Sequence, residues 1–236
     1  MTTYRKALVE QPDRADTIYT EALFRMFGLV ALGVVVTAVA IWVGDAFILG
    51  KHIFGNGWVG VLLYVGATLG VLIASHIVAN KGMLGLATAL YLGFAALEGF
   101  FISPILELAT GESMAIAFIL VAALFVLMAA IGLRTKRDLS GMGSMLFFTL
   151  FGAVVVLLLD LFIFQSGSVQ IIISIILFPV FLGLTVWETR RMKIRAQEAA
   201  LEGDAASADK VAVQAAIGLY LNVLNLFLIV YDWLPF

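Results

Sequence analysis

The sequence predicts an all-α integral membrane protein, built as a bundle of seven transmembrane helices. Three observations support this fold class: an unusually apolar composition, seven long apolar stretches, and a one-sided distribution of basic residues. Of the 236 residues, 63% are hydrophobic and 13% are charged, whereas soluble domains have roughly 45–50% apolar and about 25% charged residues. A soluble domain of this length could not hide so much apolar surface from water, so lipid is the expected solvent.

The apolar stretches have the length of membrane-spanning helices, which need about 20 mostly apolar residues. They lack the strict alternation of barrel strands, and this favours helices. We predict a polar N-terminal segment, 1–23, followed by a single membrane domain over 24–236, in which 189–211 is the one sizeable polar segment. The predicted spans are 24–44, 58–79, 83–103, 113–133, 141–164, 169–188 and 212–232.

The basic residues predict the orientation, because Lys and Arg concentrate in cytoplasmic loops. With the N-terminus in the cytoplasm, residues 1–25, 80–82, 134–140 and 188–211 are all inside, and they hold 13 of the 14 Lys and Arg residues. Lys51 alone is outside. This distribution places the C-terminus outside and agrees with seven spans.

The composition also argues against several classes of protein. The net charge of −2 offers no basic excess for binding nucleic acid. Cysteine is absent and there are two histidines, which disfavours thiolate, zinc or haem chemistry. No phosphate loop, nucleophile triad or cluster of metal ligands stands out. We therefore expect neither an enzyme nor a bound cofactor.

Ionisable residues at membrane depth are costly and are default candidates for function. Glu98 lies inside the third span, where it should face the bundle interior or water. Asp160 and His76 lie near span ends, so each could instead reach the interface. Glu188 closes the sixth span, where neighbouring arginines could pair with it at the interface.

Two amides, Asn222 and Asn225, lie in the seventh span. They are three residues apart and therefore share one face of a helix. Such amides either join helices by hydrogen bonds or line a polar path.

Three sequence motifs resemble those of the Bax inhibitor-1 family, specifically its bacterial branch. They are TKRDLSGMG (135–143), GLTVWETRRM (183–192) and LYLNVLNLFL (219–228). The similarity extends over essentially the whole chain in the number, spacing and orientation of the spans. It implies a seven-helix fold in which the other six helices surround the last one.

The resemblance also implies a function, because bacterial members look like pH-sensitive calcium leak channels. In them, one aspartate of the sixth helix and one of the seventh share a proton, and titration of the pair moves the bundle between closed and open forms. Here Glu188 stands at the first position and Asn222 at the second. An amide cannot ionise, so this pair can form a hydrogen bond but cannot act as a two-proton switch.

Two functions follow as hypotheses. The first is a passive path for Ca²⁺ or another cation, to which Glu98, Asp160, Glu188, Asn222 and Asn225 could contribute some of the oxygen ligands that hard cations prefer. The second is a non-transporting regulator or modulator of a membrane-anchored quality-control protease, for which the polar segment 1–23 is a plausible handle. Some bacterial relatives look like such modulators.

Overall fold

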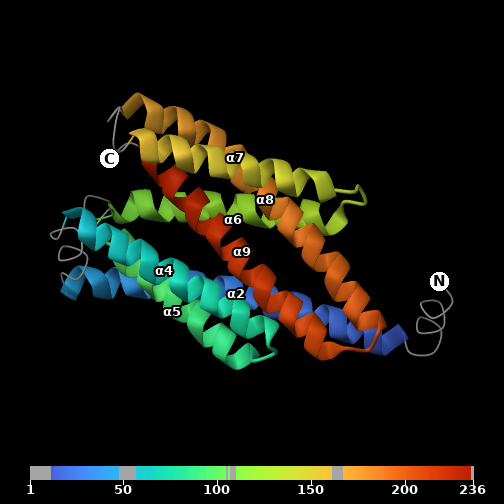
Figure 1. The fold of residues 1–236 in the computed structure, drawn as a ribbon. Helices are drawn as coiled ribbons and strands as arrows, with labels where there is room; N and C mark the ends of the chain where they lie inside the picture. The colour runs from blue at the N-terminus through green and yellow to red at the C-terminus, as the bar shows by residue number, and fades with distance from the viewer. Residues whose placement is uncertain (1–11, 48–56, 105, 107–109, 161–166, 235–236) are drawn as a thin grey trace. The chain divides into compact units, whose positions relative to one another are not determined.

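The computed structural model describes residues 12–47, 57–104, 106, 110–160 and 167–234. Within these ranges the chain forms seven helices and no strand (Figure 1). All seven are long and apolar enough to cross a membrane, which confirms the predicted fold class. The helices are α2 (Pro12–Phe47), α4 (Gly57–Asn80), α5 (Leu84–Ile102), α6 (Gly111–Arg134), α7 (Ser140–Leu159), α8 (Gly167–Leu201) and α9 (Ala205–Asp232).

Each predicted span coincides with one helix, and the largest differences lie at helix ends. The helix α2 begins at Pro12, well before the predicted span at 24. The polar segment 189–211 is not a loop: α8 continues to Leu201, and α9 begins at Ala205. Its composition explains this, because Ala, Arg, Gln and Glu are strong helix formers and keep the chain helical after it leaves lipid. The end of the fifth span, 161–164, lies outside the described residues.

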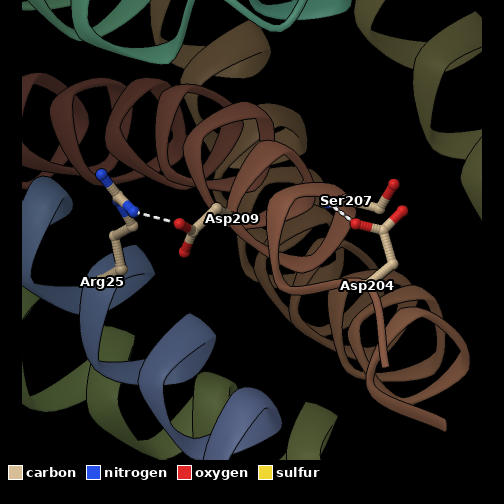
Figure 2. A network of polar contacts seen from close by, with 4 residues as sticks. All are labelled: Arg25, Asp204, Ser207 and Asp209. Atoms are coloured by element: carbon tan, nitrogen blue, oxygen red, sulfur yellow. Dashed lines mark hydrogen bonds and ion pairs between the residues drawn. The ribbon is translucent and has the colours of Figure 1, made fainter. Parts of the chain in front are cut away.

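A short turn separates α8 from α9. Gly203 adopts a φ of +73° there, a conformation that glycine enters without the steric cost of a side chain. Asp204 then caps α9, because its Oδ1 accepts a hydrogen bond from the Ser207 backbone N–H at 3.0 Å (Figure 2). This satisfies one of the N–H groups that the first helical turn leaves without a partner.

The Asp204 cap predicts a pH-dependent contribution to stability. Hydrogen bonds from the Ser207 side chain and backbone hold the pKa of this carboxyl below its usual value. Because the folded-state pKa lies below the unfolded one, the contribution is complete above about pH 4 and is lost as the pH falls through the folded-state pKa. Asp204→Ala should therefore lower the thermal midpoint in detergent at neutral pH, and the deficit should shrink on acidification.

The Asp204→Asn variant is the matched control, since asparagine keeps the capping oxygen but does not ionise. It should retain most of the neutral-pH stability. A deficit in Asp204→Ala that is equally large at neutral and acidic pH would contradict this assignment.

By their internal contacts, the residues fall into two compact units. Unit 1 comprises Met1–Ala109 and Met192–Tyr220, and unit 2 comprises Thr110–Arg191 and Leu221–Phe236. Both α8 and α9 therefore contribute one part to each unit. The predicted boundaries of the membrane domain, 24–236, stay a prediction.

The last helix is the most buried one, as expected. In α9, 61% of the most apolar stretch is buried, against 11–33% in the other six helices. Those six expose large apolar side chains, among them Leu62 on α4 and Phe148 on α7, which is the surface that lipid tails cover. Because α9 has little surface left for lipid, it can carry amides such as Asn222, which is 6% exposed.

Glycines allow close approach of helices within each unit. In unit 1, a Cβ placed on Gly99 of α5 would lie 2.5 Å from the Thr37 carbonyl oxygen of α2. In unit 2, a Cβ on Gly132 of α6 would lie 2.6 Å from the Val186 carbonyl oxygen of α8. Small residues at such contacts are how transmembrane helices gain van der Waals packing in lipid.

Candidate functional site

The predicted site residues divide between the two units. Glu188, Asn222, Asn225 and Asp160 belong to unit 2, whereas Glu98 belongs to unit 1. The structure therefore provides two polar places to consider, each of which is described by itself.

Glu188 lies on a closely packed turn of α8. It is partly buried, and the two threonines on either side of it in that helix, Thr185 and Thr189, are fully buried. Gly132 of α6 packs directly against this turn, since a Cβ there would lie 2.9 Å from Cβ of Thr189. The Thr189 hydroxyl is buried and has no hydrogen-bond partner in the part of the chain that the structure describes. Glu188 thus precedes, in the sequence, a buried hydroxyl that has no hydrogen-bond partner among the described residues.

Two of the family-like motifs pack against each other next to Glu188. A Cβ on Gly143, in motif 135–143, would overlap the indole ring of Trp187. The Arg191 guanidinium lies over the same indole at 4.9 Å from the ring centroid, a distance typical of a cation–π contact. Asp138 lies within electrostatic range of Arg190: the Ser140 N–H, and to a smaller extent this arginine, hold the pKa of the Asp138 carboxyl below its usual value.

The two amides of α9 differ in their surroundings. Asn222 is buried. Asn225 is partly buried, and its Nδ2 donates to the Leu221 carbonyl oxygen one turn earlier at 2.7 Å. The Asn225 amide therefore forms its hydrogen bond within its own helix. This favours a structural role for Asn225 over a role as a cation ligand.

The residues predicted near span ends lie at or near helix ends. Asp160 is the C-cap of α7, with its N–H donating to the Leu157 and Val156 carbonyl oxygens. His76 lies in the last two turns of α4, and its Nδ1 is 3.2 Å from the Leu72 carbonyl oxygen. Neither position by itself indicates an ion path.

In unit 1, Glu98 lies near a group of buried hydroxyls that we did not predict from the sequence. The carboxyl group lies within electrostatic range of the Tyr64 hydroxyl of α4 and the Tyr220 hydroxyl of α9. Tyr64 and Tyr220 are both buried. The signal available in the sequence was the presence of single tyrosines well inside apolar spans, where their hydroxyls need partners.

Thr37 of α2 connects this group to the backbone. Its Oγ1 lies 2.9 Å from the Gly33 carbonyl oxygen, 3.0 Å from the Ala95 carbonyl oxygen and 2.7 Å from Oη of Tyr220. Since the one hydroxyl hydrogen of Thr37 is directed to the carbonyls, Tyr220 donates to Thr37. The contact therefore ties α2, α5 and α9 together through buried hydrogen bonds.

Polar contacts also fix the beginning of α9 within unit 1. Arg25 of α2 forms an ion pair with Asp209 (Figure 2), and Gln214 Nε2 donates to Asn80 Oδ1 of α4 at 3.0 Å. These groups are exposed, and exposed pairs contribute little to stability. They set the register of α9 against α2 and α4.

Comparison with known proteins decides the family. The model of the family described as "Inhibitor of apoptosis-promoting Bax1" matches residues 20–234. The chain belongs to the Bax inhibitor-1 family. This confirms the resemblance that the three motifs indicated.

Bacterial members of the family are similar to this chain over most of its length. The inner membrane protein YbhL of Escherichia coli K12 is 29% identical over 204 residues, which cover 86% of each chain. A protein of Borreliella burgdorferi is 30% identical over 211 residues, covering 89% of this chain and 90% of that one. The membrane protein SpyM3_0260 of Streptococcus pyogenes is 36% identical over 169 residues, covering 71% and 72%.

Proposed function

We propose that this Bax inhibitor-1 family protein is a passive cation leak in a bacterial inner membrane, that Ca²⁺ is the ion it passes, and that protonation of Glu188 regulates the leak. The observation that carries the proposal is the place of Glu188 on α8, partly buried beside the fully buried Thr185 and Thr189. A carboxyl group there can attract a cation or take up a proton. No catalytic step belongs to this function.

The chemistry of the gate follows from the residue types. A single carboxylate loses its charge when it binds one proton, and with the charge it loses its attraction for a cation. Asn222 offers an oxygen and two N–H donors but no second ionisable group. The gate should therefore respond to one proton, which gives a shallower pH dependence than a coupled pair of acids.

The orientation is part of the proposal. The N-terminus lies in the cytoplasm and the C-terminus outside, because 13 of 14 basic residues then face the cytoplasm. Ca²⁺ would move inward down its gradient, which needs no coupled energy source.

Calcium flux into proteoliposomes tests the proposal. Wild type, Glu188→Gln and Asn222→Asp are compared at mildly acidic and mildly alkaline pH. Wild type should leak above empty vesicles, Glu188→Gln should change the leak and remove most of its pH dependence, and Asn222→Asp should steepen that dependence. Glu198→Gln is the matched control, because Glu198 is exposed on the polar part of the same helix, and it should behave as wild type.

The alternative function is regulation of a membrane-anchored quality-control protease. Its expected result is co-purification with such a protease that depends on residues 1–23, together with no flux in any variant. Part of that segment is helical, since α2 begins at Pro12, while residues 1–11 lie outside the described residues. Absence of flux in every variant would overturn the leak.

A further inference from the structure

Glu98 is a carboxyl group at membrane depth that the proposed gate does not use. It lies on α5, is partly buried, and has no ion-pair partner among the described residues. An uncompensated charge inside the membrane is expensive. The groups around Glu98 therefore determine whether its carboxyl group is protonated or ionised.

Stacking holds Tyr64 beside Glu98. The rings of Tyr64 and Phe101 lie parallel, with centroids 3.9 Å apart and planes inclined by 8°. Phe101 follows Glu98 by three residues on α5, so both side chains share one face of that helix. The ring contact thus brings the Tyr64 hydroxyl of α4 within range of the Glu98 carboxyl group.

The Tyr64 hydroxyl is buried, and the described residues offer it no hydrogen bond of ordinary geometry. Leaving such a group without a partner is energetically unfavourable. Glu98 is the carboxyl group that lies within electrostatic range of the Tyr64 hydroxyl. The two groups can therefore act as donor and acceptor of one hydrogen bond. Which group donates depends on whether the Glu98 carboxyl group carries a proton.

The surrounding side chains are uncharged. Tyr220 of α9 lies within electrostatic range of both Glu98 and Tyr64. Tyr91 of α5 and Thr37 of α2 contact Tyr220 in turn. Tyr220 is committed to Thr37, and Tyr91 donates to the Leu29 carbonyl oxygen at 3.0 Å. No second carboxylate and no Lys or Arg contributes a charge among these neighbours.

We propose that Glu98 and Tyr64 form a proton-binding site inside unit 1, built on α4 and α5 and independent of Glu188. One carboxylate balances one positive charge, and a divalent ion would leave an excess charge in the membrane interior. The free oxygen ligands, two from Glu98 and one from Tyr64, are too few for the six to eight that Ca²⁺ takes. A proton satisfies both conditions.

The exchange is a simple one. In the neutral state the carboxyl O–H donates to Oη of Tyr64, or Tyr64 donates to the carbonyl oxygen of the acid. In the ionised state Tyr64 donates to the carboxylate. The proton comes from water and returns to it, and only the O–H bond forms or breaks.

Infrared difference spectroscopy of the protein in liposomes of neutral lipid tests the site. A pH change should produce C=O bands of protonated carboxylic acids. One of these bands should be missing in Glu98→Gln, and the same band should shift in frequency in Tyr64→Phe, which keeps the acid but removes its partner. The exposed Glu112→Gln on α6 is the control and should leave the band in place.

Three results would overturn the inference: carboxyl bands in Glu98→Gln identical to those of wild type, carboxyl bands in Tyr64→Phe identical to those of wild type, or no pH-dependent carboxyl band in folded wild type. Loss of the band on adding Na⁺ or Ca²⁺ at fixed pH would assign the site to a metal ion instead. Because the measurement detects proton occupancy and not flux, its outcome is separate from that of the calcium leak. Circular dichroism checks that each variant is folded.

Discussion

Replacement of Gly99 by alanine is expected to destabilise the protein by about 1–3 kcal/mol, the range for adding a methyl group to a packed contact. The added Cβ would lie 2.5 Å from the Thr37 carbonyl oxygen and 2.6 Å from Cβ of Ala40. Both atoms belong to or adjoin the backbone of α2, so no flexible side chain can move aside. The helices α2 and α5 would have to separate.

Gly93→Ala is the matched control for Gly99→Ala. Gly93 lies on the same helix, and a Cβ there meets nothing within 4 Å. Alanine should be neutral or stabilising at that position, by up to about 0.5–1 kcal/mol, because it restricts the unfolded chain. Unfolding in mixed micelles, followed by circular dichroism, measures both variants. Equal stabilities for the two would show that the approach of α2 to α5 is not as close as the structure has it.

Replacement of Gly132 by alanine is expected to have a similarly large effect in unit 2. The new Cβ would lie 2.6 Å from the Val186 carbonyl oxygen and 2.9 Å from Cβ of Thr189. This contact holds α6 against the turn of α8 that carries Glu188. We expect a loss of about 1–3 kcal/mol in the free energy of unfolding, measured by the same denaturation.

Gly152→Ala on α7 is the control in this unit, since its Cβ would meet nothing within 4 Å. If Gly132→Ala folds, it also has a functional readout, because a displaced α8 turn should change the pH dependence of the calcium leak. A variant as stable as Gly152→Ala, with unchanged flux, would argue that Gly132 does not position Glu188.

The family motifs gain a physical meaning from these contacts. Motif 135–143 provides Gly143, which makes room for Trp187 of motif 183–192. The rings of Trp187 and Phe147 of α7 also form a T-shaped pair, with centroids 5.7 Å apart. The packing of these two motifs determines where the α8 turn lies and, through it, where Glu188 lies. The third motif contributes Asn222 from the most buried helix.

Composition was sufficient to predict the class of fold. The length and apolarity of each stretch identify a membrane helix, because backbone groups in lipid must form their hydrogen bonds within the segment. The helix ends were less predictable. Apolarity marks where the chain meets lipid, whereas the end of α8 depends on helix propensity, which continues through the polar residues to Leu201.

Composition alone could not predict which residues meet. In a soluble helix, an apolar stripe marks the buried face, but a membrane helix is apolar on all sides and carries little such signal. The seven helices, the carboxyl groups at membrane depth and the family motifs could all be predicted from the sequence. The structure was needed to show that Tyr64 stacks on Phe101, one turn from Glu98, that Thr37 contacts Tyr220, and that Gly99 and Gly132 are close contacts. These pairings depend on packing between segments that are distant in the chain, and local composition does not encode it.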